Sequence, residues 1–109
     1  MAKFLILYTS PMSFEQQMAN ATPEEMQKGM EPWMAWFGKH GGSIVDMGSP
    51  LAHGQHFTQQ GSSASQSQLA GYTIVEAGDM AGVKGLVDGH PHFMQPGNTI
   101  EVLEIMPMG

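Results

Sequence analysis

Two histidines separated by one proline, His90-Pro91-His92, are the side chains of this sequence best suited to acid–base chemistry. Imidazole exchanges its proton near neutral pH, which is what a general acid or base requires. Pro91 favours an extended backbone at His90, and residues two apart in an extended chain point the same way. The two imidazoles are therefore predicted to converge, with His92 as the acid or base. The alternative is structural: one histidine shapes a turn and the other is exposed.

A carboxylate and two phenols are candidates to complete such a site. Asp46 is predicted to orient His92 or His90 in a His–Asp pair, because a catalytic base is usually held by a third group. The alternative for Asp46 is a solvated position on a strand edge. Tyr8 and Tyr72 are predicted to bind substrate at the pocket rim, with plain packing as their alternative role.

Two further histidines, His53 and His56, stand three apart in a predicted turn. Together with His90 and His92 they would offer nitrogen ligands to zinc, nickel or copper. No cysteine or carboxylate lies at a supporting spacing, so neither a metal nor a cofactor is predicted. There is no glycine-rich phosphate loop either, which argues against nucleotide chemistry.

Composition limits the class of protein and its partners. The chain of 109 residues has the length of one domain, predicted over residues 1–109. Four Lys+Arg against ten Asp+Glu give a formal charge of −6, which argues against nucleic acid and membrane surfaces as partners. The apolar run Phe4–Tyr8 is too short for a signal peptide or a membrane span, so a cytoplasmic location is predicted.

The longest predicted element is a helix over Thr22–Gly42. Thr22 is a suitable N-cap and Pro23 suits the first helical position. Pro32 lies in the interior, where it predicts a kink or a division into two helical pieces. The spacing of the large apolar residues predicts one buried stripe. Its members are Met26, Met30, Trp33, Met34 and Phe37.

Strand and helix patterns elsewhere define the fold class. Shorter helices are predicted over Ser13–Asn20 and Asp79–Gly89, a mobile polar loop over Gln59–Gln68 and an extended connection over His90–Gly97. The order of elements predicts an α+β, ferredoxin-like split βαβ sandwich (βαββαβ), with one extra hairpin strand as an option. The strands are predicted over Lys3–Thr9, Ser43–Gly48, Gln55–Gln60, Leu69–Ala77 and Thr99–Met106.

Two helices can cover only one face of such a sheet. The first and last strands carry apolar residues on both faces, so the second face also needs cover. A second copy of the sheet is the simplest cover, and a homodimer through the open sheet face is predicted.

Four stretches in the expected order make the chain resemble the YCII-related family, in the branch with DGPF domains. They are FLILY, ATPEEMQKGMEPWMAWFGKHGG, LAGYTIVEA and DGHPHFMQPGNTIEVLEIMPM. The resemblance implies a ferredoxin-like fold that dimerises as a dimeric α/β barrel with a pocket between sheet and helices. The Asp-Gly-Pro-Phe motif is replaced by a polar run around Gly61–Ser65. No histidine precedes His40, where enzyme-like members carry that of a His–Asp pair, so their catalytic assignment does not transfer.

Three functional hypotheses follow. The first is a small homodimeric enzyme that binds a small organic molecule and performs a lyase-like elimination or another proton transfer. The second is a non-catalytic ligand-binding or regulatory module that uses the same pocket. The third is a dimeric-barrel monooxygenase, which rests on analogy of fold.

Overall fold

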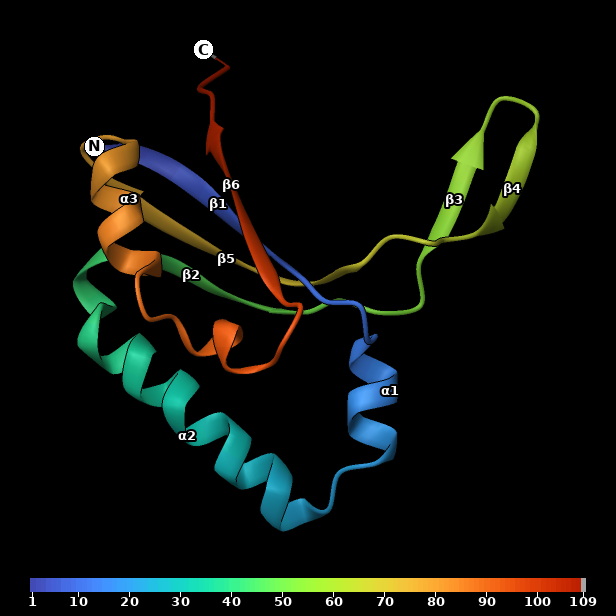
Figure 1. Ribbon diagram of the computed structural model, residues 1–109. Helices are drawn as coiled ribbons and strands as arrows, with labels where there is room; N and C mark the ends of the chain where they lie inside the picture. Colours follow the sequence, from blue (N-terminus) through green and yellow to red (C-terminus); the bar gives the residue numbers. More distant parts are fainter. Residues whose placement is uncertain (109) are drawn as a thin grey trace.

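A four-stranded antiparallel sheet forms the body of the protein in a computed structural model that describes residues 1–108. The strand order is β2-β5-β1-β6, so the first strand lies inside the sheet and the last lies at its edge (Figure 1). With helices on one side of this sheet, the predicted α+β class is confirmed. The strands are β1 (Ala2–Thr9), β2 (Ile44–Pro50), β5 (Leu69–Ala77) and β6 (Thr99–Ile105).

The inner face of the sheet is built from alternate residues of β1 and β5. Phe4, Ile6 and Tyr8 of β1 are all buried. Phe4 pairs with Val75 and Ile6 pairs with Thr73, so the buried residues of the two strands lie side by side. This strict alternation follows from the period of two in a β-strand, which sends successive side chains to opposite faces.

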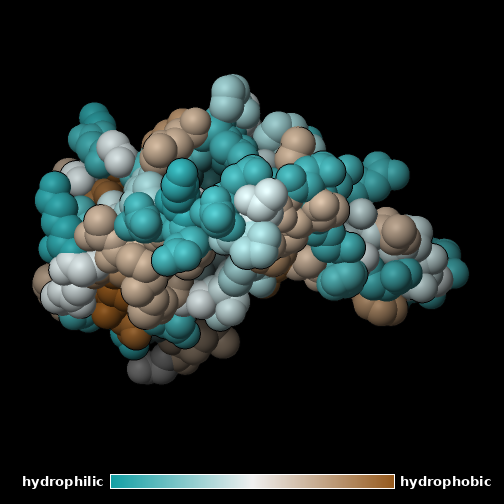
Figure 2. Space-filling model, turned by 90° about the horizontal axis from the view of Figure 1, so that it is seen from below, coloured by the Kyte–Doolittle hydropathy of each residue, from teal (hydrophilic) through white to brown (hydrophobic). Residues whose placement is uncertain are grey.

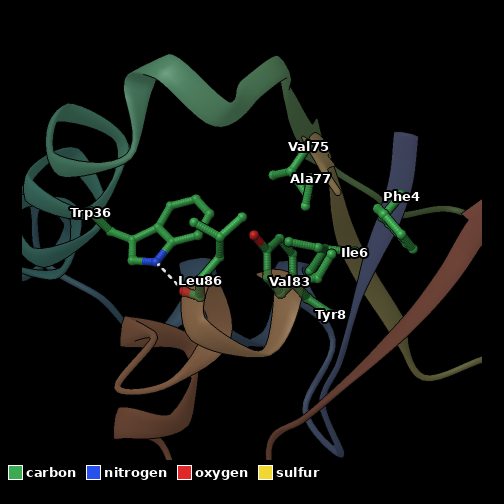
Figure 3. Packing of buried hydrophobic residues seen from close by; sticks show 8 residues of the cluster. All are labelled: Phe4, Ile6, Tyr8, Trp36, Val75, Ala77, Val83 and Leu86. Carbon is green, nitrogen blue, oxygen red and sulfur yellow. Dashed lines mark hydrogen bonds between the residues drawn. The ribbon is translucent and has the colours of Figure 1, made fainter. Parts of the chain in front are cut away.

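Three helices accompany the sheet: α1 (Phe14–Ala19), α2 (Pro23–Lys39) and α3 (Met80–Val87). Val83 and Leu86 of α3 and Trp36 of α2 belong to the same buried cluster as the inner sheet residues (Figure 3). The Trp36 indole N–H donates a hydrogen bond to the Leu86 carbonyl at 2.9 Å. This bond joins the two helices where their apolar sides meet.

The N-terminal end of α2 follows the sequence prediction. The Thr22 hydroxyl accepts a hydrogen bond from the Glu25 amide at 3.1 Å, which satisfies one of the amides that the first turn leaves unpaired. The helix then runs without division through Pro32 to Lys39 and is followed by a 3-10 turn, η1 (Gly41–Ser43). Of the two predicted alternatives the division is therefore wrong, and a kink near Gly29 to Pro32 stays a prediction.

The buried side of α2 is rotated from the predicted stripe. Met30 and Met34 are 52% and 54% exposed, so their predicted burial is wrong. Trp36, which the stripe omitted, is the buried residue of the helix, and Trp33 and Phe37 pack beside it against the core. Trp36 is the buried residue because its indole reaches both the apolar cluster and a carbonyl acceptor on α3.

A hairpin arm projects from the end of the sheet (Figures 1 and 2). It consists of β3 (Gln55–Thr58) and β4 (Gly61–Ala64), which pair in antiparallel fashion. The prediction of a loop over Gln59–Gln68 is thus wrong at β4, because backbone pairing with β3 needs no apolar side chains. Phe57 on the arm is 74% exposed. The projection raises the radius of gyration to 15.3 Å, against about 13 Å for a compact chain of this length.

The outer face of the sheet carries apolar side chains without a covering helix. Leu5 pairs with Leu103 on β6 and with Ile74 on β5, which places the three side by side across the sheet. Leu5 and Ile74 are half-buried, and Leu103 is 50% exposed. This outer face is extended by Leu7, Tyr72 and Ile105.

Candidate functional site

His90 is the most deeply buried titratable residue that the sequence pattern singled out. It follows α3 and precedes a short 3-10 helix, η2 (Pro91–Met94). Its backbone is extended (φ −59°, ψ 139°), as Pro91 predicts. Its Nδ1 accepts a hydrogen bond from the His92 amide at 3.0 Å and so caps η2. The predicted extended connection over His90–Gly97 is therefore wrong at Pro91–Met94, while both imidazoles lie against the Tyr8 ring, at centroid distances of 5.1 and 5.0 Å.

A chain of hydrogen bonds runs inward from the His90 ring. Because Nδ1 is an acceptor, the neutral ring carries its proton on Nε2, which lies 3.1 Å from the Tyr8 hydroxyl. The Tyr8 hydroxyl lies 2.8 Å from the Thr73 hydroxyl, and the Thr73 hydroxyl donates to the Met47 carbonyl at 3.0 Å. Each group therefore accepts from one neighbour and donates to the next, from His90 through Tyr8 and Thr73 to Met47.

Burial keeps the side chains of this hydrogen-bond series uncharged at neutral pH. It lowers the pKa of His90 from 6.5 to about 4, and positive charge on His92 and His40 would lower it further. Burial also raises the pKa of Tyr8 to about 12, although the hydrogen bond with Thr73 opposes that rise. At pH 7 the His90 imidazole and the Tyr8 phenol are both neutral, so the chain holds protons in place.

His92 also packs against the Tyr8 ring, at a centroid distance of 5.0 Å, and is buried. Its Nε2 lies 2.9 Å from the Thr9 carbonyl, which can only accept, so Nε2 carries the proton. Its Nδ1 has a long contact of 3.4 Å with the side-chain amide nitrogen of Asn98. Burial lowers the pKa of His92, and hydrogen bonding to the backbone of Thr9 and Thr99 opposes that shift.

The side chain of Asn98 holds the backbone of His92 in place, but only part of its hydrogen-bonding capacity is used. Its amide nitrogen donates to the His92 carbonyl at 3.0 Å. Its Oδ1 is buried and, among the described residues, has no hydrogen-bond partner. A buried acceptor without a partner costs about 1–3 kcal/mol, which makes this oxygen a point of potential interaction.

Aromatic rings enclose the two histidines. The His90 ring centroid lies 4.8 Å from that of Trp33 and 4.3 Å from that of Trp36, both on α2. The Tyr8 ring lies 5.0 Å from Trp33 in an edge-on arrangement and 5.0 Å from His92. The two histidines therefore pin η2 between β1 and α2, which is a structural task.

Two of the predicted site residues lie elsewhere. Tyr72 pairs with Leu7 and occupies the outer face of the sheet, opposite to Tyr8. Asp46 is exposed in an irregular part of β2, where its carboxylate accepts a hydrogen bond from the Gly48 amide at 2.8 Å. Gly48 has φ +78°, and a Cβ there would lie 1.7 Å from the Tyr72 carbonyl oxygen. The structure thus joins His90, His92 and Tyr8, but it does not bring Asp46 or Tyr72 to them.

A cleft lies just beyond the C-terminal end of β1, between α1, the loop after β2 and the segment that leads into β5. It consists of two adjoining hollows of about 500 and 530 Å³. Both hollows are lined by Glu15, Ala52 and His53. The Nδ1 of His53 lies 3.1 Å from a carboxylate oxygen of Glu15. Neither hollow is lined by Tyr8, Tyr72, His90 or His92.

Sequence reasoning misses this Glu15–His53 pair. The spacing of the histidines indicates His53 only as a metal ligand with His56, and no pattern singles out Glu15. The two residues are distant in the chain, and only the packing of α1 against the loop after β2 brings them together. The one local signal is Gly54 near Pro50, which marks a turn.

Metal ligation finds no support in the geometry. His53 lies in the cleft loop, whereas His56 lies on the exposed arm. Among residues 1–108, no three histidine, aspartate or glutamate side chains gather closely enough to hold a metal ion.

Comparison with known proteins adds no assignment: no protein-family model and no curated protein matches the chain. The resemblance to the YCII-related family therefore stays a prediction. In the described part of the chain, none of the helices combines the length and apolar character that a membrane crossing requires.

Proposed function

We propose that the protein is a homodimer that binds a small organic molecule, with the ligand in the cleft beside α1. The observation that carries this proposal is the pair of adjoining hollows, each of about 500 Å³. Ligand pockets usually measure about 300–1,000 Å³ and combine apolar walls with a few polar groups. The cleft has both, since Phe14 and Met18 line one hollow and Ser10 and Ser67 line the other.

The homodimer is supported by the outer face of the sheet. Leu5, Ile74 and Leu103 lie side by side there, and no other element of residues 1–108 covers them. A contiguous apolar patch of this kind usually marks an interface. The strand order β2-β5-β1-β6 supports the predicted ferredoxin-like sandwich, in which two sheets would pair as a dimeric α/β barrel.

Sedimentation velocity tests the dimer. We expect the wild-type protein to sediment as a dimer and Leu103→Lys to sediment as a folded monomer, because a lysine would be buried without a partner in the interface. Phe57→Lys is the matched control, since Phe57 is exposed on the arm away from the sheet face. A folded wild-type monomer at high concentration would contradict this part of the proposal.

Amide chemical shifts test the ligand site. A collection of uncharged aromatic fragments is titrated into ¹⁵N-labelled protein, and the responding amides are mapped onto the structure. We expect the largest shifts at residues 51–54 and 65–69, which line the cleft. Shifts confined to other parts of the protein, or none at all, would contradict a binding site here.

A second candidate is proton-transfer catalysis by His92, the role predicted from the sequence. It is favoured by the long 3.4 Å contact at His92 Nδ1 and by the unpaired Oδ1 of Asn98 beside it. Both atoms are buried acceptors, so a substrate O–H or N–H would bond to either one only where η2 moves to admit it. The same fragment titration distinguishes the candidates, because binding here would shift the ring signals of His92 and leave those of His53 unchanged.

A further inference from the structure

The Glu15–His53 pair occupies the wall that the two hollows of the cleft share. Glu15 and His53, together with Ala52, line both hollows, so a molecule that fills the cleft must pass over this pair. Both side chains are open to solvent, with exposed fractions of 52% and 78%. An exposed pair of this kind stabilises a fold by at most about 1 kcal/mol. Its position in the cleft is therefore more informative than its contribution to stability.

The two hollows differ in chemical character. The first is lined, apart from the pair, by Phe14, Met18, Pro50 and Ala52. The second is lined mainly by hydroxyl and amide side chains. A ligand that occupies both needs an apolar portion at one end and a hydrogen-bonding portion at the other. The polar side chains of the second hollow are Ser10, Ser13, Gln16, Ser65, Gln66, Ser67 and Gln68.

The charge of the cleft restricts the ligand further. Glu15 and His53 are the only ionisable side chains among the residues that line the two hollows. Among residues 1–108, no lysine or arginine lines either hollow, and the full sequence has a formal charge of −6. A carboxylate or phosphate on the ligand would face Glu15 without a compensating cation, which disfavours anions.

The geometry also determines how His53 meets a ligand. His53 Nδ1 faces a carboxylate oxygen of Glu15 at 3.1 Å, so Nε2 is the ring nitrogen that is left to meet a ligand. The backbone of His53 is left-handed (φ +58°), a conformation that is uncommon outside glycine. Such conformations occur more often at binding sites, where the surrounding structure holds them in place.

We propose that the Glu15–His53 pair recognises an uncharged or cationic amphipathic molecule in this cleft. Glu15 lies against Nδ1 of the His53 ring, and His53 Nε2 forms a hydrogen bond with the polar group of the ligand. The apolar end of the ligand lies against Phe14 and Met18. This inference rests on the proposed ligand-binding function and names the chemical class of the ligand and the residues that select it.

Three probes of one shape test the selectivity: 2-phenylethanol, 2-phenylethylamine and phenylacetate. They are neutral, cationic and anionic at pH 7.5, and each is titrated into ¹⁵N-labelled full-length protein. We expect the first two to shift the amides of residues 51–54 with a Kd of about 10 mM, as is usual for such small ligands. Phenylacetate should bind at least about tenfold more weakly.

Variants separate this inference from the proposed function. His53→Asn retains tolerance of the left-handed backbone, and we expect it to raise the Kd for 2-phenylethanol by about fivefold, the value of one hydrogen bond. Glu15→Gln should reduce the difference in Kd between 2-phenylethylamine and phenylacetate. His56→Asn is the control, because His56 lies on the arm and not in the cleft.

The outcomes are distinguishable. If no probe shifts the amides of the cleft, the binding site itself is wrong. If all three probes bind equally, or if His53→Asn binds 2-phenylethanol as the wild type does, the cleft remains a binding site but the Glu15–His53 pair does not select its ligand.

Discussion

Replacing Tyr8 with phenylalanine removes one oxygen from the middle of the buried hydrogen-bond chain. His90 Nε2–H then loses its acceptor at 3.1 Å. The Thr73 hydroxyl loses the donor at 2.8 Å but keeps its own bond to the Met47 carbonyl. The substitution therefore leaves one buried donor unpaired and creates no cavity of note.

The expected loss of stability follows from that unpaired donor. A buried group without a hydrogen-bond partner costs about 1–3 kcal/mol. The phenyl ring keeps the edge-on contact with Trp33 and the packing against His90 and His92. We therefore expect Tyr8→Phe to lower the free energy of unfolding by about 2 kcal/mol. With an m-value of about 2 kcal/mol/M, the urea midpoint falls by about 1 M.

Urea unfolding followed by tryptophan fluorescence and far-UV circular dichroism measures this loss. Tyr72→Phe is the matched control, with both substitutions made in the monomeric Leu103→Lys background, because there the hydroxyl of Tyr72 lies on an uncovered outer face and belongs to no chain of buried bonds. We expect a change within about 0.5 kcal/mol for the control. Equal effects of the two substitutions would refute the assignment of protons along the chain, as would an NMR spectrum in which the His90 proton lies on Nδ1.

Further predictions concern pH and the helices. His90 has its ordinary pKa of 6.5 in the unfolded chain and a pKa of about 4 in the folded protein. The contribution of neutral His90 to stability is therefore complete above pH 6.5, and the free energy of unfolding falls by up to roughly 3 kcal/mol as the pH drops toward 4. Urea midpoints measured across this pH range test the fall, and His90→Asn should show a shallower slope. Folded Tyr8 keeps its proton to about pH 12, so stability also falls as pH rises above 10, and Tyr8→Phe should abolish that part of the fall. In thermal melts, Pro32→Ala should raise the free energy of unfolding by about 1–3 kcal/mol. Gly29→Ala should raise it by up to about 1 kcal/mol, because an added Cβ there meets nothing within 4 Å. If neither substitution raises the free energy of unfolding, α2 is bent in a way that requires these residues. Trp36→Phe removes a buried hydrogen bond and should cost about 1–3 kcal/mol in urea unfolding, whereas an unchanged midpoint would show that the Trp36 indole does not join α2 to α3.

Local chemistry along the chain determines much of the fold. Thr22 and Asp79 begin helices because their side chains accept hydrogen bonds from the amides three residues ahead. The alternation in β1 gives its buried side, with Phe4 and Ile6 inward. These features depend only on neighbours in the chain, so residue order is sufficient to predict them. The dimer and the YCII-related family rest on the sequence and on an uncovered sheet face, and they stay predictions.

Tertiary contacts decided the features that the sequence left open or misplaced. The burial of Trp36 in place of Met30 and Met34 depends on where α3 offers a carbonyl, which no helical period reveals. The β4 strand forms by backbone pairing with β3, and its polar composition carries no sign of this.

The candidate sites show most clearly which features the sequence predicts and which depend on the tertiary structure. The sequence drew attention to His90 and His92 through their types and spacing, and it predicted the extended backbone at His90. Only the structure shows that the Tyr8 hydroxyl and the Thr9 carbonyl occupy the Nε2 atoms of these two histidines, and that Glu15 and His53 meet in a cleft. A residue's type states which protons it can hold, whereas its neighbours in space decide whether those protons are free to react.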